Sequence, residues 1–159
     1  MKALSGLSRY VVAALLALPI SSAQAADPYG VWLTESENGH VEIYPCANPA
    51  NGPICAKVIW LKDAVNPDKT RAQSMDDVRD VLNEDPALRN RKILGLKFMS
   101  GFKKSPDEKD VWSDGHIYNA EDGKTYRARI TVLDDKTLRL RGYVIIPLLG
   151  ETEIWKRVR

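Results

Sequence analysis

The sequence has few of the residues on which most catalytic and metal sites depend. It contains 2 histidines and 2 cysteines among 159 residues. Neither His40 nor His116 stands in an H-E-x-x-H pattern, and no G-x-S-x-G pattern occurs. Asp114 and His116 lie two positions apart and could share one face of a strand, but no nucleophile or set of metal ligands accompanies them. We therefore expect a protein that is not an enzyme and that uses no metal and no cofactor.

Long apolar runs are missing after the N-terminal segment. Lys2 and Arg9 precede an apolar stretch at 10–20, and small residues ending in AQA follow it, a pattern typical of a signal-peptidase site. The stretch is about eleven residues long, short of the roughly 20 that a membrane-spanning helix needs. We therefore favour a cleaved signal peptide at 1–25 over a transmembrane anchor, and expect a single exported domain at 26–159, periplasmic or secreted.

An excess of charge of one sign is also absent. The formal net charge is +2. Removal of a signal peptide that contains Lys2 and Arg9 but no acidic residue brings it to about zero. Binding to nucleic acid depends on clustered lysines and arginines that neutralise phosphates, so we expect no nucleic-acid partner.

The two cysteines, Cys46 and Cys55, share one short segment, YPCANPANGPICAKVIW. A metal site would need further ligands, and this segment has no other cysteine and no histidine. A redox centre would favour C-x-x-C spacing, which is absent. In an oxidising compartment the simplest interpretation is a disulfide. We predict that a Cys46–Cys55 disulfide closes a loop between two strands.

Short segments rich in β-branched and aromatic residues recur between Asn, Gly and Pro, and they predict about eight strands. These segments are 30–34, 41–45, 54–61, 92–102, 111–119, 124–133, 137–146 and 152–158. Consecutive antiparallel strands with one apolar face each close most economically into an up-and-down barrel or a sandwich. We favour an all-β antiparallel barrel.

The clearest alternation lies in 124–133, between turn signals at 122–123 and 134–136. From Tyr126 to Val132, apolar side chains occupy the even positions, and polar or basic ones the odd positions. Basic residues on this outer face, and on that of the following strand, are Arg127, Arg129, Arg139 and Arg141. We interpret them as a solvated face; an anion or polyanion site is the alternative.

The segment between the third and fourth strands carries helix signals. Ser74 and Asp77 resemble a capping box, and Pro86 after Asp85 suits the first turn of a second helix. We therefore expect a short helical insertion there, positioned to cover one end of the barrel.

Several of these motifs together resemble the bacterial exported family catalogued as domain of unknown function 2147. In chain order they are GVWLT, CAKVIWL, NEDPALRNRKILGLKFMSGF, VWSDGHIYNAEDGKTYRARITVLDDKTLRLRGYV and LLGETEIWKRV, which span residues 30–158. The resemblance implies a lipocalin-like β-barrel with an unassigned role in binding small ligands. It supplies no catalytic residues.

The interior of an eight-stranded barrel is either filled by side chains or just wide enough for one small ligand. We expect a small, mainly apolar ligand in the cell envelope. The alternatives are an envelope module for protein interaction or stress and, after it, an enzyme of unknown reaction. A cavity would favour the binder, whereas a filled barrel with an exposed apolar patch would favour the interaction module. Aromatic residues on strands are the candidate ligand contacts, with core packing as the alternative for each: Trp32, Trp60, Trp112, Tyr118, Tyr126 and Trp155.

Overall fold

The computed structural model describes residues 27–159, so the predicted signal peptide at 1–25 lies outside the described residues. The described chain forms nine strands joined by turns and four short 3₁₀ helices. The strands are β1 (Gly30–Leu33), β2 (Gly39–Pro45), β3 (Ile54–Leu61), β4 (Lys97–Ser100), β5 (Lys103–Lys104), β6 (Val111–Asn119), β7 (Lys124–Asp134), β8 (Thr137–Tyr143) and β9 (Gly150–Arg157).

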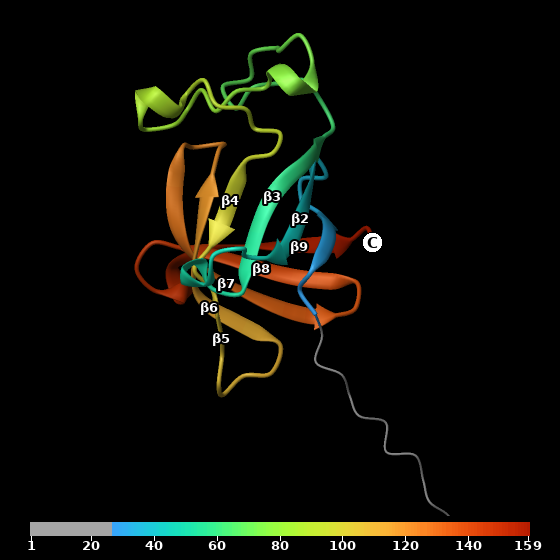
Figure 1. Cartoon of the computed structure of the whole chain (residues 1–159), viewed down its shortest axis with the longest axis vertical. Coiled ribbons are helices and arrows are strands. Elements are labelled where there is room, and N and C mark those ends of the chain that lie inside the picture. Colours follow the sequence, from blue (N-terminus) through green and yellow to red (C-terminus); the bar gives the residue numbers. More distant parts are fainter. Residues whose placement is uncertain (1–26) are drawn as a thin grey trace, which may run out of the picture.

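All of these strands belong to one sheet that closes on itself (Figure 1). The order is β4-β3-β2-β1-β9-β8-β7-β6-β5, and the pairing of β4 with β6 joins the two ends of this order. Because β4 and β5 both pair with β6, they act as two halves of one interrupted strand. The wall is therefore an eight-stranded antiparallel barrel, which confirms the predicted fold class.

The interior is apolar because β7 and β8 alternate as the sequence predicts. Ile130 and Val132 are buried and lie directly opposite Leu140 and Leu138. Neighbouring buried residues from the other strands extend this layer into one core, and each large apolar side chain there stabilises the fold by about 1.5–3 kcal/mol. The most completely buried large side chains include Trp32, Ile43, Ile54, Phe102, Ile130, Leu138 and Trp155.

The interruption between β4 and β5 directs one aromatic side chain into the barrel. Gly101 adopts a φ of +81°, a conformation that side-chain-bearing residues rarely take. Phe102 follows, fully buried, against Gly115 of β6. A methyl group on Gly115 would lie 2.5 Å from carbons of the Phe102 ring, so this position has room only for hydrogen.

Antiparallel order places the connections alternately at two ends of the barrel. We call them the insertion end and the disulfide end. The insertion end carries the loops at 34–38, 62–96, 120–123 and 144–149, and the disulfide end carries those at 46–53, 105–110 and 135–136. In Figure 1 the long segment 62–96, drawn in green to yellow-green, lies over one end of the strands.

The insertion at 62–96 is much less helical than predicted. Only two 3₁₀ turns form, at Met75–Asp77 and Pro86–Leu88. Asp85 caps the second turn as expected, by accepting a hydrogen bond from the Ala87 amide. Ser74 does not cap the first: its hydroxyl donates to the Asp77 carboxylate instead, at 2.7 Å.

Long-range hydrogen bonds explain why the helix signals fail here. The Ile93 amide donates to the carbonyl of Val78, and the Asp80 amide donates to the carbonyl of Arg91. These bonds draw the two halves of the insertion together as extended chain. For the same reason the strand predicted from residue 92 begins only at Lys97, because Ile93 packs with Val78 in a small core beneath the insertion.

Candidate functional site

A cavity of about 740 Å³ lies between the barrel and the insertion. Its apolar wall inside the barrel includes residues of six strands, and residues of the insertion also line it. The apolar barrel residues that line it include Val41, Val58, Phe98, Ile117, Leu140 and Trp155; those of the insertion include Val65, Val78, Ile93 and Leu96. The insertion end is therefore hollow, whereas Trp32, Phe102 and Trp112 belong to the buried core cluster and do not line the cavity.

The structure places three of the six predicted aromatic contacts at this cavity and three elsewhere. Tyr118, Tyr126 and Trp155 line it. Trp32 is fully buried, with its indole N–H donating to the carbonyl of Pro28 at 2.8 Å. The other two also lie outside the lining.

Trp112 and Trp60 have structural surroundings of their own. The Nζ of Lys104 lies 3.7 Å from the centre of the Trp112 ring, a cation–π contact. Trp60 is 36% exposed, and its ring centre lies 4.5 Å from that of His40. These two tryptophans therefore serve packing and the outer surface.

Tyr118 is held by a buried polar network that the sequence did not reveal. Its hydroxyl donates to Asp80 at 2.6 Å, and Asp80 also accepts hydrogen bonds from Arg91 at 2.7 Å and from Asn83 at 2.8 Å. The guanidinium of Arg91 lies 4.6 Å from the Tyr118 ring centre. Asp80 is fully buried, and a buried charge is costly unless it is hydrogen-bonded or paired. The three donors meet this need. The network fastens the insertion to β6.

The network also changes the acidity of the phenol. Burial, together with the hydrogen bond to Asp80 and its negative charge, raises the pKa of Tyr118 to about 12. In the sequence Asp80 looked like any acidic residue of an exposed helix, so its partners could not be anticipated.

Two glutamates of β9 stand on the inner face of the barrel. In the β8–β9 register, Trp155 lies opposite Leu138, Glu153 opposite Leu140 and Glu151 opposite Gly142. Side chains alternate between faces along a strand, so Glu151 and Glu153 share the inward face of Trp155. Both line the cavity. The sequence analysis missed them, although the two-residue spacing from Trp155 was a usable signal.

Glu153 is positioned by the indole beside it. The Nε1–H of Trp155 donates to the Glu153 carboxylate at 2.6 Å. A buried indole N–H needs such a partner. The bond holds one carboxylate oxygen at the edge of a buried aromatic ring on the cavity wall.

Acidic side chains surround Tyr126 on this wall. Its hydroxyl donates to the carboxylate of Asp122. That hydrogen bond, then burial and the negative charges of Asp122, Glu151 and Glu84, raise the pKa of Tyr126. The neighbourhood of Tyr126 is therefore electrically negative.

The loop between β8 and β9 forms an exposed apolar rim at the same end. Ile145 is 71% exposed and Leu148 80% exposed. Val144 and Leu149 also line the cavity. Exposed apolar side chains that cluster in this way mark a contact surface for a ligand or a partner.

Arg141 holds this loop in place. Its Nη2 donates to the carbonyl of Leu148 at 3.0 Å, its Nε donates to the carbonyl of Pro147, and its Nη1 donates to the hydroxyl of Thr152. The predicted arginine face is thus not uniformly solvated, because Arg129 also pairs with Glu108. Arg127 pairs with Asp114 at 3.5 Å, so Asp114 contacts an arginine. No hydrogen bond joins Asp114 to His116 among the described residues.

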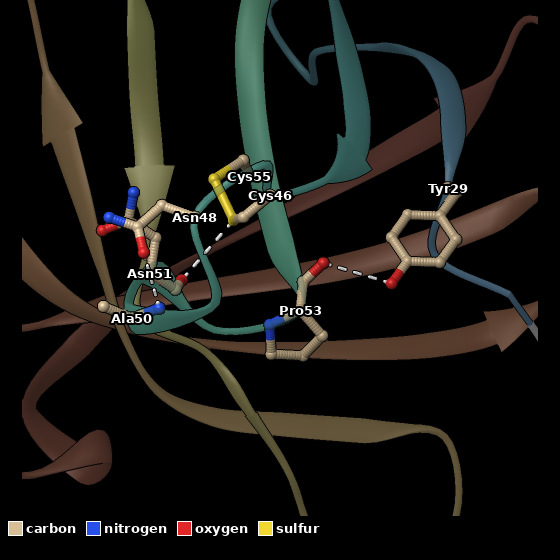
Figure 2. The surroundings of a disulfide bond; sticks show 7 residues. All are labelled: Tyr29, Cys46, Asn48, Ala50, Asn51, Pro53 and Cys55. Carbon is tan, nitrogen blue, oxygen red and sulfur yellow. Dashed lines mark hydrogen bonds between the residues drawn. A yellow bond between two sulfur atoms is a disulfide. The ribbon is translucent and has the colours of Figure 1, made fainter.

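The predicted Cys46–Cys55 bond is confirmed at the disulfide end, with an S–S length of 2.04 Å and a Cα–Cα distance of 5.1 Å. Figure 2 shows it in the loop between β2 and β3, with the Tyr29 hydroxyl directed at the carbonyl of Pro53, 3.2 Å away. Asn48 caps the turn of this loop by accepting a hydrogen bond from the Ala50 amide. The cross-link therefore lies at the opposite end from the cavity.

Among residues 27–159 no helix is long and apolar enough to cross a membrane. No group of three or more His, Cys, Asp or Glu in the described part of the chain is arranged to hold a metal ion.

A closed antiparallel barrel with a cavity at one end defines the lipocalin-like class of β-barrels. A solved structure of protein HP1028 from Helicobacter pylori, described as belonging to the lipocalin family, is similar to this chain, with a TM-score of 0.65, 28% sequence identity and coverage of 84% of each chain. Residues 30–157 match the family described as "Uncharacterized protein conserved in bacteria (DUF2147)", and the chain belongs to that family. No curated protein matches the chain.

Proposed function

We propose that this protein is a non-catalytic binder of a small, mainly apolar molecule, held in the cavity at the insertion end. The observation that carries the proposal is the cavity of about 740 Å³ with its apolar wall around Trp155. Ligand pockets in proteins commonly measure about 300–1,000 Å³. A ligand that hides roughly 300 Å² of apolar surface gains about 7 kcal/mol before the costs of association. We therefore expect dissociation constants no tighter than micromolar.

Two further observations support the proposal. The solved structure of HP1028, which shares the fold, is assigned to the lipocalin family. The Cys46–Cys55 disulfide fits an oxidising compartment, so the proposed place of action is the cell envelope or the exterior.

Intrinsic fluorescence tests the proposal, because one tryptophan lines the cavity and another lies outside the barrel. Laurate, retinol and an apolar dye are each titrated into folded protein. We expect a saturable change in emission that persists in Trp60→Phe and is largely lost in Trp155→Phe. Calorimetry on Trp155→Phe should still detect binding, since phenylalanine keeps most of the apolar wall.

The absence of any saturable change with all three compounds would contradict the proposal. It would favour the second candidate, an interaction module of the envelope that uses its outer surface. The exposed apolar loop at 144–149 supports that candidate, since Ile145 and Leu148 point largely to solvent.

A further inference from the structure

Charged groups of one sign dominate the polar part of the cavity wall. The wall includes a single lysine, Lys69, and no arginine or histidine. Its acidic members outnumber that lysine and come from three separate segments of the chain: Asp63, Glu121, Asp122, Glu151 and Glu153. The apolar cavity is therefore lined at one side by carboxylates.

The two glutamates on β9 are the most informative of these groups. They lie opposite Gly142 and Leu140 in the β8–β9 register and line the cavity, where both side chains are exposed to solvent. Within residues 27–159 no lysine or arginine forms an ion pair with Glu151 or Glu153. Two carboxylates on one face of one strand therefore line the cavity without a cationic partner, and a cationic group of a ligand would be attracted to both.

Aromatic rings form an independent second feature of the same wall. Trp155, Tyr126 and Tyr143 line the cavity together with the glutamates. Aromatic faces attract cations through their negative quadrupole, and tryptophan does so most strongly. The indole N–H of Trp155 donates to the carboxylate of Glu153 at 2.6 Å, so the aromatic ring and the carboxylate are neighbours on the cavity wall.

We propose that the ligand of this cavity is an amphiphilic cation: a small apolar body that carries one ammonium, quaternary ammonium or guanidinium group. The apolar body packs against Leu140, Phe98 and Val58, and the cationic group lies between the carboxylates of Glu151 and Glu153 and the ring of Trp155. This inference rests on the proposed function, because it names the class of ligand for the same cavity.

Three probes with one chain length and different head groups test the inference. Dodecyltrimethylammonium, dodecanol and laurate are titrated below their micellar concentrations at pH 7, with calorimetry and Trp155 emission as readouts. We expect dodecyltrimethylammonium to bind about tenfold more tightly than dodecanol, and laurate to bind more weakly than dodecanol. Raising the salt from 50 to 500 mM should reduce the preference for the cation, because ions screen charges at a solvent-filled mouth.

Isosteric neutralisation assigns the preference to the two glutamates. In Glu151→Gln/Glu153→Gln, the preference for dodecyltrimethylammonium over dodecanol should fall below about threefold. Asp107→Asn is the matched control, since Asp107 is an exposed acidic residue in the 105–110 loop at the disulfide end. It should leave the preference unchanged.

Each outcome separates this inference from the proposed function. Equal binding of the three probes, or tightest binding of laurate, overturns the cationic ligand and leaves the small-molecule binder standing. Binding of none of them contradicts the proposed function itself. If the double variant does not fold, Glu151→Gln alone and the salt dependence of the unchanged protein decide the question.

Discussion

Replacing Asp80 by asparagine tests whether one buried carboxylate fastens the insertion to the barrel. The change keeps the shape of the side chain but removes its charge and turns one acceptor into a donor. Arg91 and Tyr118 both donate to this carboxylate, at 2.7 and 2.6 Å. Asparagine can satisfy only part of this set, so at least one donor loses its partner.

The magnitude follows from the number and type of the bonds. A hydrogen bond to a charged group contributes about 1.5–3 kcal/mol, and removal of one partner of a buried ion pair costs about 3–5 kcal/mol. The side chain of Arg91 is 31% exposed and can recover some hydration, which lowers the cost. We therefore expect Asp80→Asn to lower the free energy of unfolding by about 2–4 kcal/mol.

Urea unfolding at pH 7 measures the global effect, and hydrogen exchange locates it. Because the network fastens the insertion, the amides of Asp80 and Ile93 should exchange faster while core amides of β7 and β8 change less. Asp76→Asn is the matched control in the same insertion. Asp76 is 67% exposed and pairs with Lys92 on the surface, so its loss should cost under about 0.5 kcal/mol.

The pH dependence gives a second readout of the same network. The pKa of Tyr118 is raised to about 12 in the folded protein, against about 10 in an unfolded chain. A raised folded-state pKa contributes stability that is complete below pH 10 and is lost as the pH rises toward 12. Asp80→Asn should weaken this alkaline loss. Equal costs for the Asp80 and Asp76 variants, with unchanged exchange at Ile93, would refute the reasoning.

Two further predictions concern the disulfide and the apolar loop. Reducing Cys46–Cys55 should lower the melting temperature without abolishing the fold. The free energy of unfolding should fall by about 2.7 kcal/mol or less, on the chain-entropy estimate for a ten-residue loop. Scanning calorimetry with and without reductant measures the change, and two free thiols in exported protein would contradict the bond. Arg141→Gln should loosen the loop at 144–149, seen as faster proteolysis there, whereas Arg139→Gln should change stability by under about 0.5 kcal/mol; equal behaviour of the two variants would show that the Arg141 hydrogen bonds do not hold the loop.

The strands of the barrel were predictable because the alternation of side chains and the turn residues that define them lie within short segments of the sequence. The alternation in β7 and β8 already separates the inward face from the outward one, and Asp122-Gly123 marks the turn before β7. The disulfide was equally local, since Cys46 and Cys55 are only nine positions apart, in a chain that was expected to be exported. The family resemblance also followed from ordered motifs, and the match over residues 30–157 bears it out.

The insertion was predicted less well because its local helix signals compete with contacts between residues far apart in the chain. Ser74 and Asp77 have the spacing of a helix cap. The sequence does not show which distant residues form hydrogen bonds that compete with a helix here. In the structure the Val78 carbonyl is bonded to the Ile93 amide, fifteen positions further on. Tertiary hydrogen bonds and burial of Val78 therefore outweigh a weak helix propensity.

By itself the sequence determined most of the strand pattern and the cross-link and favoured a barrel over a sandwich, because these depend on side-chain alternation or on residues close together in the chain; closure of the barrel was decided by the pairing of β4 with β6. Only the tertiary structure decided which aromatic residues meet a cavity and which fill the core. Trp112 and Trp155 look alike as strand tryptophans and both belong to the core cluster, yet only Trp155 also lines the cavity. The position of a residue along the barrel axis depends on the register between strands and on which loops cover each end. For the same reason, the position of Glu151 and Glu153 at the cavity follows only from the pairing of β9 with β8.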